Sequence, residues 1–153
     1  MGAQAVDDLP IRNRQLRDLY TYWVGLRHGR RIPPRAAFDP TAVPRLLPNL
    51  ILLDVEPETG RQIVRVLGTR VAAVYGRDYT GKYLDEIYFG ANLESVLNDY
   101  GTCAREGRPV LEYRDFRNVR DVLYRMERLI LPFSDDDTRV NKVISGLHFL
   151  PKD

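Results

Sequence analysis

Residues 63–87, IVRVLGTRVAAVYGRDYTGKYLDEI, decide the fold of this chain. The first five residues read as a β-strand that ends at Gly68. A short helix is predicted over residues 69–75, because glycines stand at both of its ends. The segment GRDYTGK, residues 76–82, then predicts a glycine-punctuated loop. A strand, a short helix and such a loop, in this order, predict a small α+β domain.

The composition of the chain is typical of one globular domain. It has 153 residues, of which 44% are hydrophobic and 29% charged, and its net charge is +2. That charge is too small to indicate a nucleic-acid partner, which requires a strongly basic face. No run of about 20 apolar residues marks a membrane span, and no apolar secretory segment opens the chain. We therefore expect a cytoplasmic protein with no nucleic-acid and no membrane partner.

A leader helix is predicted over residues 12–27. Its apolar residues recur every three or four positions, which places them on one face. Two partners for this face are open: the helix's own domain, or the same helix of a second subunit. In the second case the chain forms a homodimer, and the interface candidates are Leu16, Leu19, Tyr20 and Trp23.

A proline-rich connector follows the leader helix over residues 32–48. Within it, Asp39 and Pro40 predict the capped start of a short helix that runs to Leu47. The predicted organisation is therefore an N-terminal tail, leader helix and connector over residues 1–48, and a core over residues 49–153.

The core is predicted to hold two strands, three helical pieces and then three more strands. Strands grouped in this way favour an antiparallel sheet with its helices on one side, instead of alternating βα units. The predicted strands span residues 50–55, 62–67, 109–116, 122–132 and 141–149, and the predicted helices span residues 69–75, 84–88 and 92–106.

Several segments, taken together, resemble those of a known family. In order, the core segments are RVLGT (65–69), YGRD (75–78), TGKYL (80–84) and LILPFSDD (129–136). With this order and spacing, the chain resembles a PAS domain from about residue 50 to residue 150. The segment YWVGLRHGRRIP (22–33) is similar to the leader helix of small, single-domain bacterial PAS proteins.

The resemblance implies a curved, five-stranded antiparallel sheet with short helices on one face, together with an N-terminal helix. It also implies signalling, often through dimers, and no catalysis, so we expect no enzyme. The chain would act as a sensory or protein-interaction module in bacterial signal transduction, without a fused output domain. Its expected partners are a second copy of itself and an unidentified signalling protein.

In some members of this family, a cavity between helices and sheet holds a small ligand. Here Met126, Arg128 and Ile130 share one face of the fourth strand, and Arg125 and Glu127 share the other. The alternation leaves open which set points inward. A pocket with one guanidinium favours a ligand with an aromatic or acyl body and an anionic group. The ligand-binding candidates are Tyr75, Tyr88, Phe89, Tyr100, Met126, Arg128 and Ile130.

Two alternatives to ligand sensing stay open. In the first, the aromatic side chains fill the core, Arg128 pairs with a surface acid, and the chain is a pure protein-interaction scaffold. In the second, the chain is an isomerase-like α+β enzyme. That enzyme needs a titratable pair facing a pocket, such as His148 with an aspartate.

No cofactor or metal is expected. Flavin-binding photosensory PAS domains carry their cysteine in an Asn-Cys-Arg-type motif, whereas Cys103 lies in the segment GTCAR. Haem PAS domains use a histidine of the long helix, and residues 92–106 contain none. Three adjacent aspartates at positions 135–137 are typical of a solvated turn, not of a calcium loop. The lone cysteine favours a reducing compartment.

Overall fold

The computed structural model describes residues 9–151. Its centre is a sheet of five strands in the order β2-β1-β5-β4-β3, and all neighbouring strands are antiparallel. The predicted α+β class and five-stranded antiparallel sheet are confirmed. The strands are β1 (Leu50–Val55), β2 (Gln62–Leu67), β3 (Val110–Arg117), β4 (Leu123–Phe133) and β5 (Lys142–Pro151).

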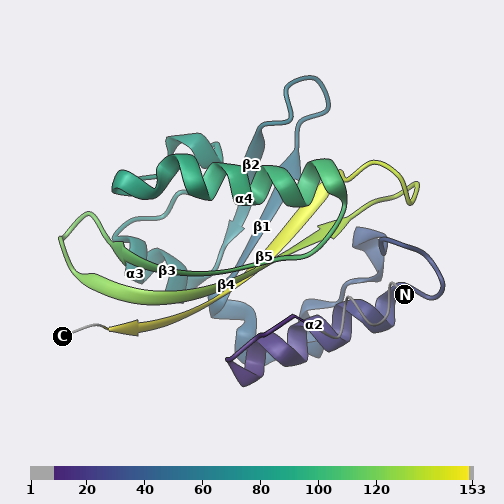
Figure 1. Ribbon diagram of the computed structural model, residues 1–153, viewed down its shortest axis with the longest axis horizontal. Helices are drawn as coiled ribbons and strands as arrows, with labels where there is room; N and C mark the ends of the chain where they lie inside the picture. Colours follow the sequence, from purple (N-terminus) through teal and green to yellow (C-terminus); the bar gives the residue numbers. More distant parts are fainter. Residues whose placement is uncertain (1–8, 152–153) are drawn as a thin grey trace.

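Helices cover both faces of this sheet (Figure 1). The helix α4 (Leu93–Glu106) and the short helix α3 (Thr69–Tyr75) pack on one face, which we call the α4 face. The leader helix α2 (Arg14–Leu26) packs on the other, the α2 face. Each face therefore has its own hydrophobic core. The remaining helical pieces are 3₁₀ turns: η1 (Arg35–Ala37), η2 (Pro40–Ala42), η3 (Pro44–Asn49), η4 (Leu84–Glu86) and η5 (Gly90–Asn92).

The strand β4 contributes to both cores, because successive side chains of a strand point to opposite faces. Met126 and Ile130 belong to the core of the α4 face, and Arg128 lies between them on the same face. The core of the α2 face takes Leu129, Leu131 and Phe133. The question that the sequence left open is thus answered: Arg128 points inward, beneath α4.

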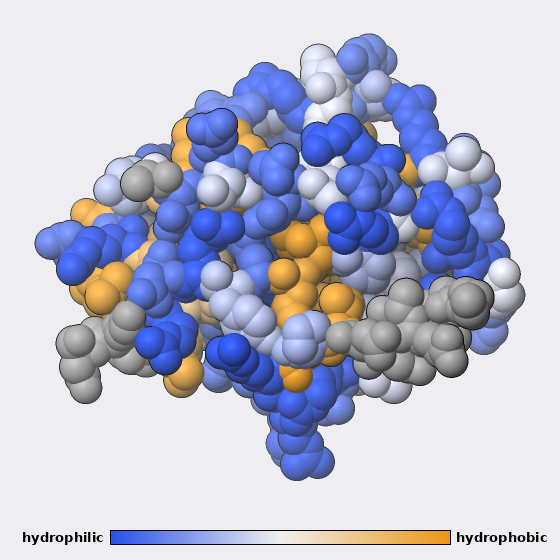
Figure 2. Space-filling view, in the orientation of Figure 1, coloured by the Kyte–Doolittle hydropathy of each residue, from blue (hydrophilic) through white to orange (hydrophobic). Residues whose placement is uncertain are grey.

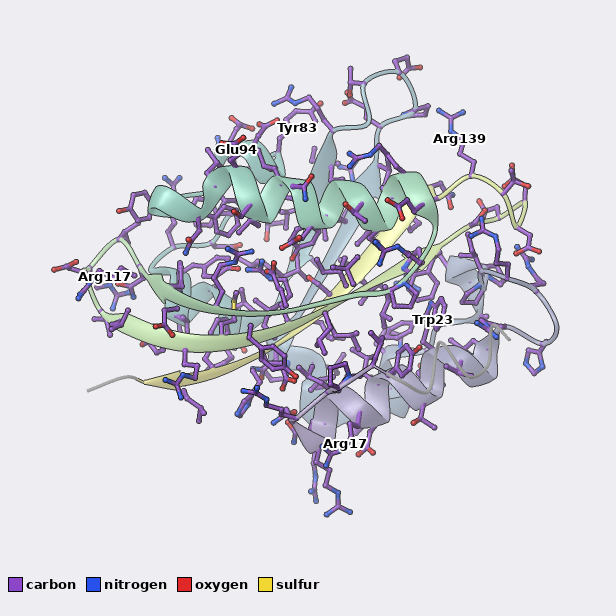
Figure 3. All side chains as sticks on the ribbon, viewed as in Figure 1. Arg17, Trp23, Tyr83, Glu94, Arg117 and Arg139 are labelled. Carbon is purple, nitrogen blue, oxygen red and sulfur yellow. The ribbon has the colours of Figure 1, made fainter. Side chains whose placement is uncertain are left out.

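The leader helix lies directly on its own sheet. Trp23 Nε1 donates a hydrogen bond to the Pro132 carbonyl oxygen at 2.9 Å. Figure 3 shows Trp23 between α2 and the sheet, with Arg17 on the far side of the helix. Gly146 of β5 permits the close approach, since a Cβ there would lie 2.8 Å from Leu19 Cδ2. Of the two partners considered from the sequence, this helix takes its own domain.

Two polar side chains fix the start of α2. Asn13 caps the helix, because its Oδ1 accepts from the amide of Leu16 at 3.0 Å. The buried carboxylate of Glu127, on β4, accepts from the backbone amides of Arg12 at 2.6 Å and Asn13 at 2.7 Å. The beginning of the helix is therefore tied to the middle of the sheet.

The stretch from β2 to α3 has the predicted bounds. Gly68 lies at the junction, directly beneath the end of η3, where a Cβ would clash with the Pro48 carbonyl oxygen and lie 2.8 Å from that of Leu47. Gly76 ends α3 with a φ of 90°, a conformation that favours glycine. The two glycines thus set the length of this helix.

The prediction of one continuous helix from Asp39 to Leu47 is wrong, because the structure has two separate turns, η2 and η3, in this stretch. Asp39 does cap a helical turn, since its Oδ1 accepts from the amide of Thr41 at 3.0 Å. That turn ends after Ala42, and Val43 adopts a φ of −130° and ψ of 55° before η3 begins. The physical reason is Pro44, because a residue that precedes proline is disfavoured in the helical conformation.

Hydrophilic side chains cover most of the molecular face drawn in Figure 2, and apolar ones gather at the level of the sheet. Across residues 9–151, no helix combines the length and the hydropathy that crossing a bilayer requires.

Candidate functional site

An arginine lies at the centre of the core beneath α4. Arg128 is only 1% exposed. Its Nη1 donates to the carboxylate of Glu112 on β3, and its Nη2 donates to Tyr75 Oη of α3 at 3.1 Å. Nη2 also contacts Met126 Sδ at 3.3 Å. The guanidinium therefore joins strand β3, strand β4 and helix α3.

Aromatic rings surround this guanidinium. Its central carbon lies 5.3 Å from the ring centroid of Tyr100 and 5.8 Å from that of Phe89, both within the range of cation–π attraction. The ring of Tyr75 in turn packs against Phe89 at 5.9 Å and Phe116 at 5.4 Å. The positive charge of Arg128 therefore lies in a largely aromatic shell.

The helix α4 positions Tyr100 over the sheet. Val96, Tyr100 and Cys103 are spaced by four and three residues, so one helical face is buried. Tyr100 Oη shares a hydrogen bond of 2.7 Å with Ser145 Oγ of β5, and its carbonyl oxygen accepts from Gln62 Nε2 at 3.0 Å. Burial raises the pKa of Tyr100, so its hydroxyl stays neutral.

The polar contacts continue from the core toward the surface. Arg114 Nη2 donates to Glu112 Oε2 at 3.0 Å and to Asp99 Oδ2 of α4 at 2.9 Å. We call Tyr75, Asp99, Glu112, Arg114 and Arg128 the Arg128 cluster.

The ionised forms of Arg128 and Glu112 support one another. Burial alone would lower the pKa of Arg128, but the Glu112 carboxylate and the hydrogen bond to Tyr75 outweigh it, and the pKa is raised. Burial would raise the pKa of Glu112, but the charge of Arg128 and hydrogen bonds from Asp99 and Arg114 lower it. Both groups are therefore charged at neutral pH inside the domain.

The structure brings most of the predicted ligand-binding residues together. Tyr75, Phe89, Tyr100, Met126, Arg128 and Ile130 all lie buried beneath α4. Tyr88 does not join them, because its side chain is 49% exposed. Its neighbour Phe89 takes the inward position instead.

Sequence reasoning missed the acidic side of the site. The expected partner of Arg128 is a surface acid, whereas the observed partner, Glu112, is buried and lies directly opposite Arg128 in the strand register. Arg114 and Asp99 were missed as well. The available signal was the alternation of β3, which places Glu112 on the same face as Phe116, together with the need of a buried arginine for a counter-ion.

The candidate dimer residues of the leader helix are covered by the chain's own sheet. Leu16, Leu19, Tyr20 and Trp23 are all buried in the core of the α2 face. In this arrangement they are not exposed to a second subunit.

His148 lies on the α2 face, half-buried in a surface pocket of about 360 Å³. The carboxylate that lines this pocket is Glu127, which stands opposite His148 in the strand register. Both carboxylate oxygens of Glu127 already accept hydrogen bonds from backbone amides, one from Arg12 and one from Asn13. The isomerase-like alternative, which needs a titratable pair such as His148 with an aspartate, gains no support from this geometry.

Cys103 is buried in α4, and burial raises the pKa of its thiol, which keeps it protonated. Within the described residues, no group of three or more histidine, cysteine, aspartate or glutamate side chains is placed to hold a metal ion.

The sequence profile of the family described as "PAS domain" matches residues 11–148. The chain therefore belongs to the PAS domain family. No curated protein matches the sequence.

Solved structures share the fold. A light-oxygen-voltage domain studied with a flavin analogue aligns with a TM-score of 0.58 and 9% identity, over 74% of this chain and 84% of that one. The PAS domain of a Colwellia psychrerythraea protein aligns with a TM-score of 0.54 and 7% identity, over 69% and 87%. VqmA bound to DPO aligns with a TM-score of 0.56 and 12% identity, over 72% and 56%. At these identities the likeness shows the fold alone.

Proposed function

We propose that this chain is a sensory module of bacterial signal transduction whose Arg128 cluster binds a small ligand with an apolar body and an anionic group. The observation that carries the proposal is a charged guanidinium, 1% exposed, inside a shell of aromatic rings. The fold of a PAS domain and the ligand-bound state of VqmA support it by analogy.

The chemistry of each part of the ligand follows from its surroundings. The anionic group would pair with the Arg128 guanidinium, and the apolar body would lie among Tyr75, Phe89 and Tyr100. Because these rings occupy the interior, a ligand enters only if α3 or α4 shifts relative to the sheet. Binding would therefore favour a second arrangement of the helices, which a signalling protein or a second copy of the chain would read.

The test uses native mass spectrometry of freshly purified protein and thermal shift with two probes, benzoate and octanoate. The site variant is the double substitution Glu112→Gln/Arg128→Met, which removes both charges while keeping the interior filled. The control is Arg125→Met, an exposed position of the same strand. We expect the wild type and the control to bind a probe or retain a small molecule, and the double variant to do neither. A wild type that binds neither probe and retains nothing would overturn the proposal.

A second candidate function, a protein-interaction scaffold, is favoured by the close packing of the rings around Tyr75. A partner would then dock on exposed apolar side chains such as Val119, Val122 and Leu150. Replacing these three by serine would abolish partner binding in a scaffold and leave probe binding unchanged in a sensor.

A further inference from the structure

A line of charged contacts runs from the surface of α4 to the middle of the core. Asp99 Oδ2 lies 2.9 Å from Arg114 Nη2, which lies 3.0 Å from Glu112 Oε2. Glu112 then pairs with Arg128. The side chain of Asp99 is 23% exposed, whereas that of Arg128 is 1% exposed. The outer end of the line thus meets solvent and its inner end does not.

The charges in this line balance only when both acids are ionised. Arg114 and Arg128 supply two positive charges, and Asp99 and Glu112 supply two negative charges. If Asp99 is protonated, the line keeps one uncompensated positive charge. The Nε atoms of Arg114 and Arg128 are also buried and donate to no atom of the described chain. Two buried donors are therefore unused, which is costly unless an acceptor arrives.

Asp99 is placed to change its charge near neutral pH. Burial and the nearby Glu112 carboxylate raise its pKa to about 7, although Arg114 opposes them. The charged groups that face it are Arg114 and Glu112 of β3, with Arg128 of β4 behind Glu112. The acids of η4 are engaged elsewhere, Asp85 with Arg61 and Glu86 with the backbone amide of Tyr83.

We propose that an anionic ligand binds at the Arg128 cluster together with one proton, which Asp99 takes up. This inference rests on the proposed function and adds the condition under which the site accepts its ligand. Protonation of Asp99 leaves the positive charge that the ligand neutralises, so the bound state keeps a balanced interior. By linkage, the ligand and the proton then strengthen each other's binding equally.

The first test measures the affinity of benzoate and octanoate for the wild type at about pH 6 and about pH 8, where both probes are ionised. Coupling to one proton predicts an affinity that falls by up to about tenfold per pH unit above the titration of Asp99. Asp99→Asn carries no ionisable group at this position, so its affinity should stay constant with pH and match or exceed that of the wild type at the lower pH.

The control variant is Glu94→Gln, which removes a carboxylate from the outer side of the same helix (Figure 3). It should keep the wild-type dependence on pH. Probe binding that is equally tight at both pH values, or a pH dependence that survives in Asp99→Asn, would overturn the inference while leaving the proposed function intact. Absence of probe binding at both pH values would overturn the inference, and it would overturn the proposed function as well if the purified protein retains no small molecule.

A second readout needs no ligand. Because the folded-state pKa of Asp99 is raised from 3.8 to about 7, folding favours its protonated form. That stabilisation is fully present at pH values below the unfolded pKa of 3.8 and is lost as the pH rises through about 7. Urea unfolding should therefore show that the wild type loses stability relative to Asp99→Asn as the pH is raised from 3.8 to about 7. Parallel stability curves for the two proteins would contradict the charge assignment on which the coupling depends.

Discussion

Glu112 and Arg128 form an ion pair across β3 and β4, directly opposite each other in the strand register and both buried. Glu112 also pairs with Arg114, and it is the carboxylate that pairs with Arg128. Removing Glu112 therefore leaves the buried charge of Arg128 without its counter-ion. We expect Glu112→Gln to lower the free energy of unfolding by about 3 kcal/mol, and Glu112→Gln/Arg128→Met to recover most of that loss. Urea unfolding of the four proteins of this double-mutant cycle measures the coupling. Additive losses would show that the two side chains do not act as a pair.

Two glycines should respond to alanine in opposite directions. At Gly68 a Cβ would clash with the Pro48 carbonyl oxygen, so Gly68→Ala should cost about 2 kcal/mol. At Gly25, near the end of α2, a Cβ has nothing within 4 Å, so Gly25→Ala should add about 0.5 kcal/mol through helix propensity. Thermal unfolding compares the two variants. A stable Gly68→Ala variant would mean that β2 and η3 are not held as close as described.

Glu127 should govern the docking of the leader helix. Glu127→Ala removes the acceptor of the Arg12 and Asn13 amides, with an expected loss of about 2 kcal/mol. The loss should be local, so amide hydrogen exchange at Leu16 and Leu19 should accelerate more than exchange in β5. Glu94→Ala, an exposed site on α4, is the control and should change neither region. Uniformly faster exchange would instead indicate global destabilisation.

Asp136 should add stability that disappears in acid. Its carboxylate accepts from the amides of Arg139 at 2.8 Å and Thr138 at 2.9 Å, which with Ser134 lowers its pKa to about 2. Because the pKa of Asp136 is lower in the folded protein than its unfolded value of 3.8, the ionised carboxylate stabilises the fold at pH values above 3.8. This stabilisation is lost as the pH falls through about 2. Asp136→Ala should therefore be less stable than the wild type at neutral pH and approach it in acid. Carboxyl chemical shifts followed by NMR titration give the pKa directly.

Local signals were enough to predict most of the fold. The bounds of β1, β2 and α3 follow from glycine and turn positions, because these residues act on the backbone nearest to them. The break at Val43 was missed, since the effect of Pro44 on its predecessor competed with the capping signal of Asp39. The apolar stripe of α2 predicted a buried face, but it carried no information on which surface would cover it.

The candidate site was predicted only in part, because its chemistry depends on contacts between distant segments. Alternation placed Met126, Arg128 and Ile130 on one face of their strand, but it did not show whether that face points inward. Glu112 was harder to assign, since β3 carries charged residues on both of its faces, and only the shared face with Phe116 together with a buried arginine in need of a counter-ion singles it out. Phe89, and not Tyr88, points into the core because of the conformation of the short connection between η4 and η5. A hydrophobic period does not predict the conformation of such a connection.

Residues 127 and 128 are consecutive, yet they serve opposite sides of the sheet. The first holds the N-terminal segment through two amides, and the second holds the aromatic interior through its guanidinium. A rotation or translation of β4 at this point displaces both attachments at once. The peptide bond between Glu127 and Arg128 therefore couples the position of the aromatic core beneath α4 to that of the N-terminal segment that leads into α2.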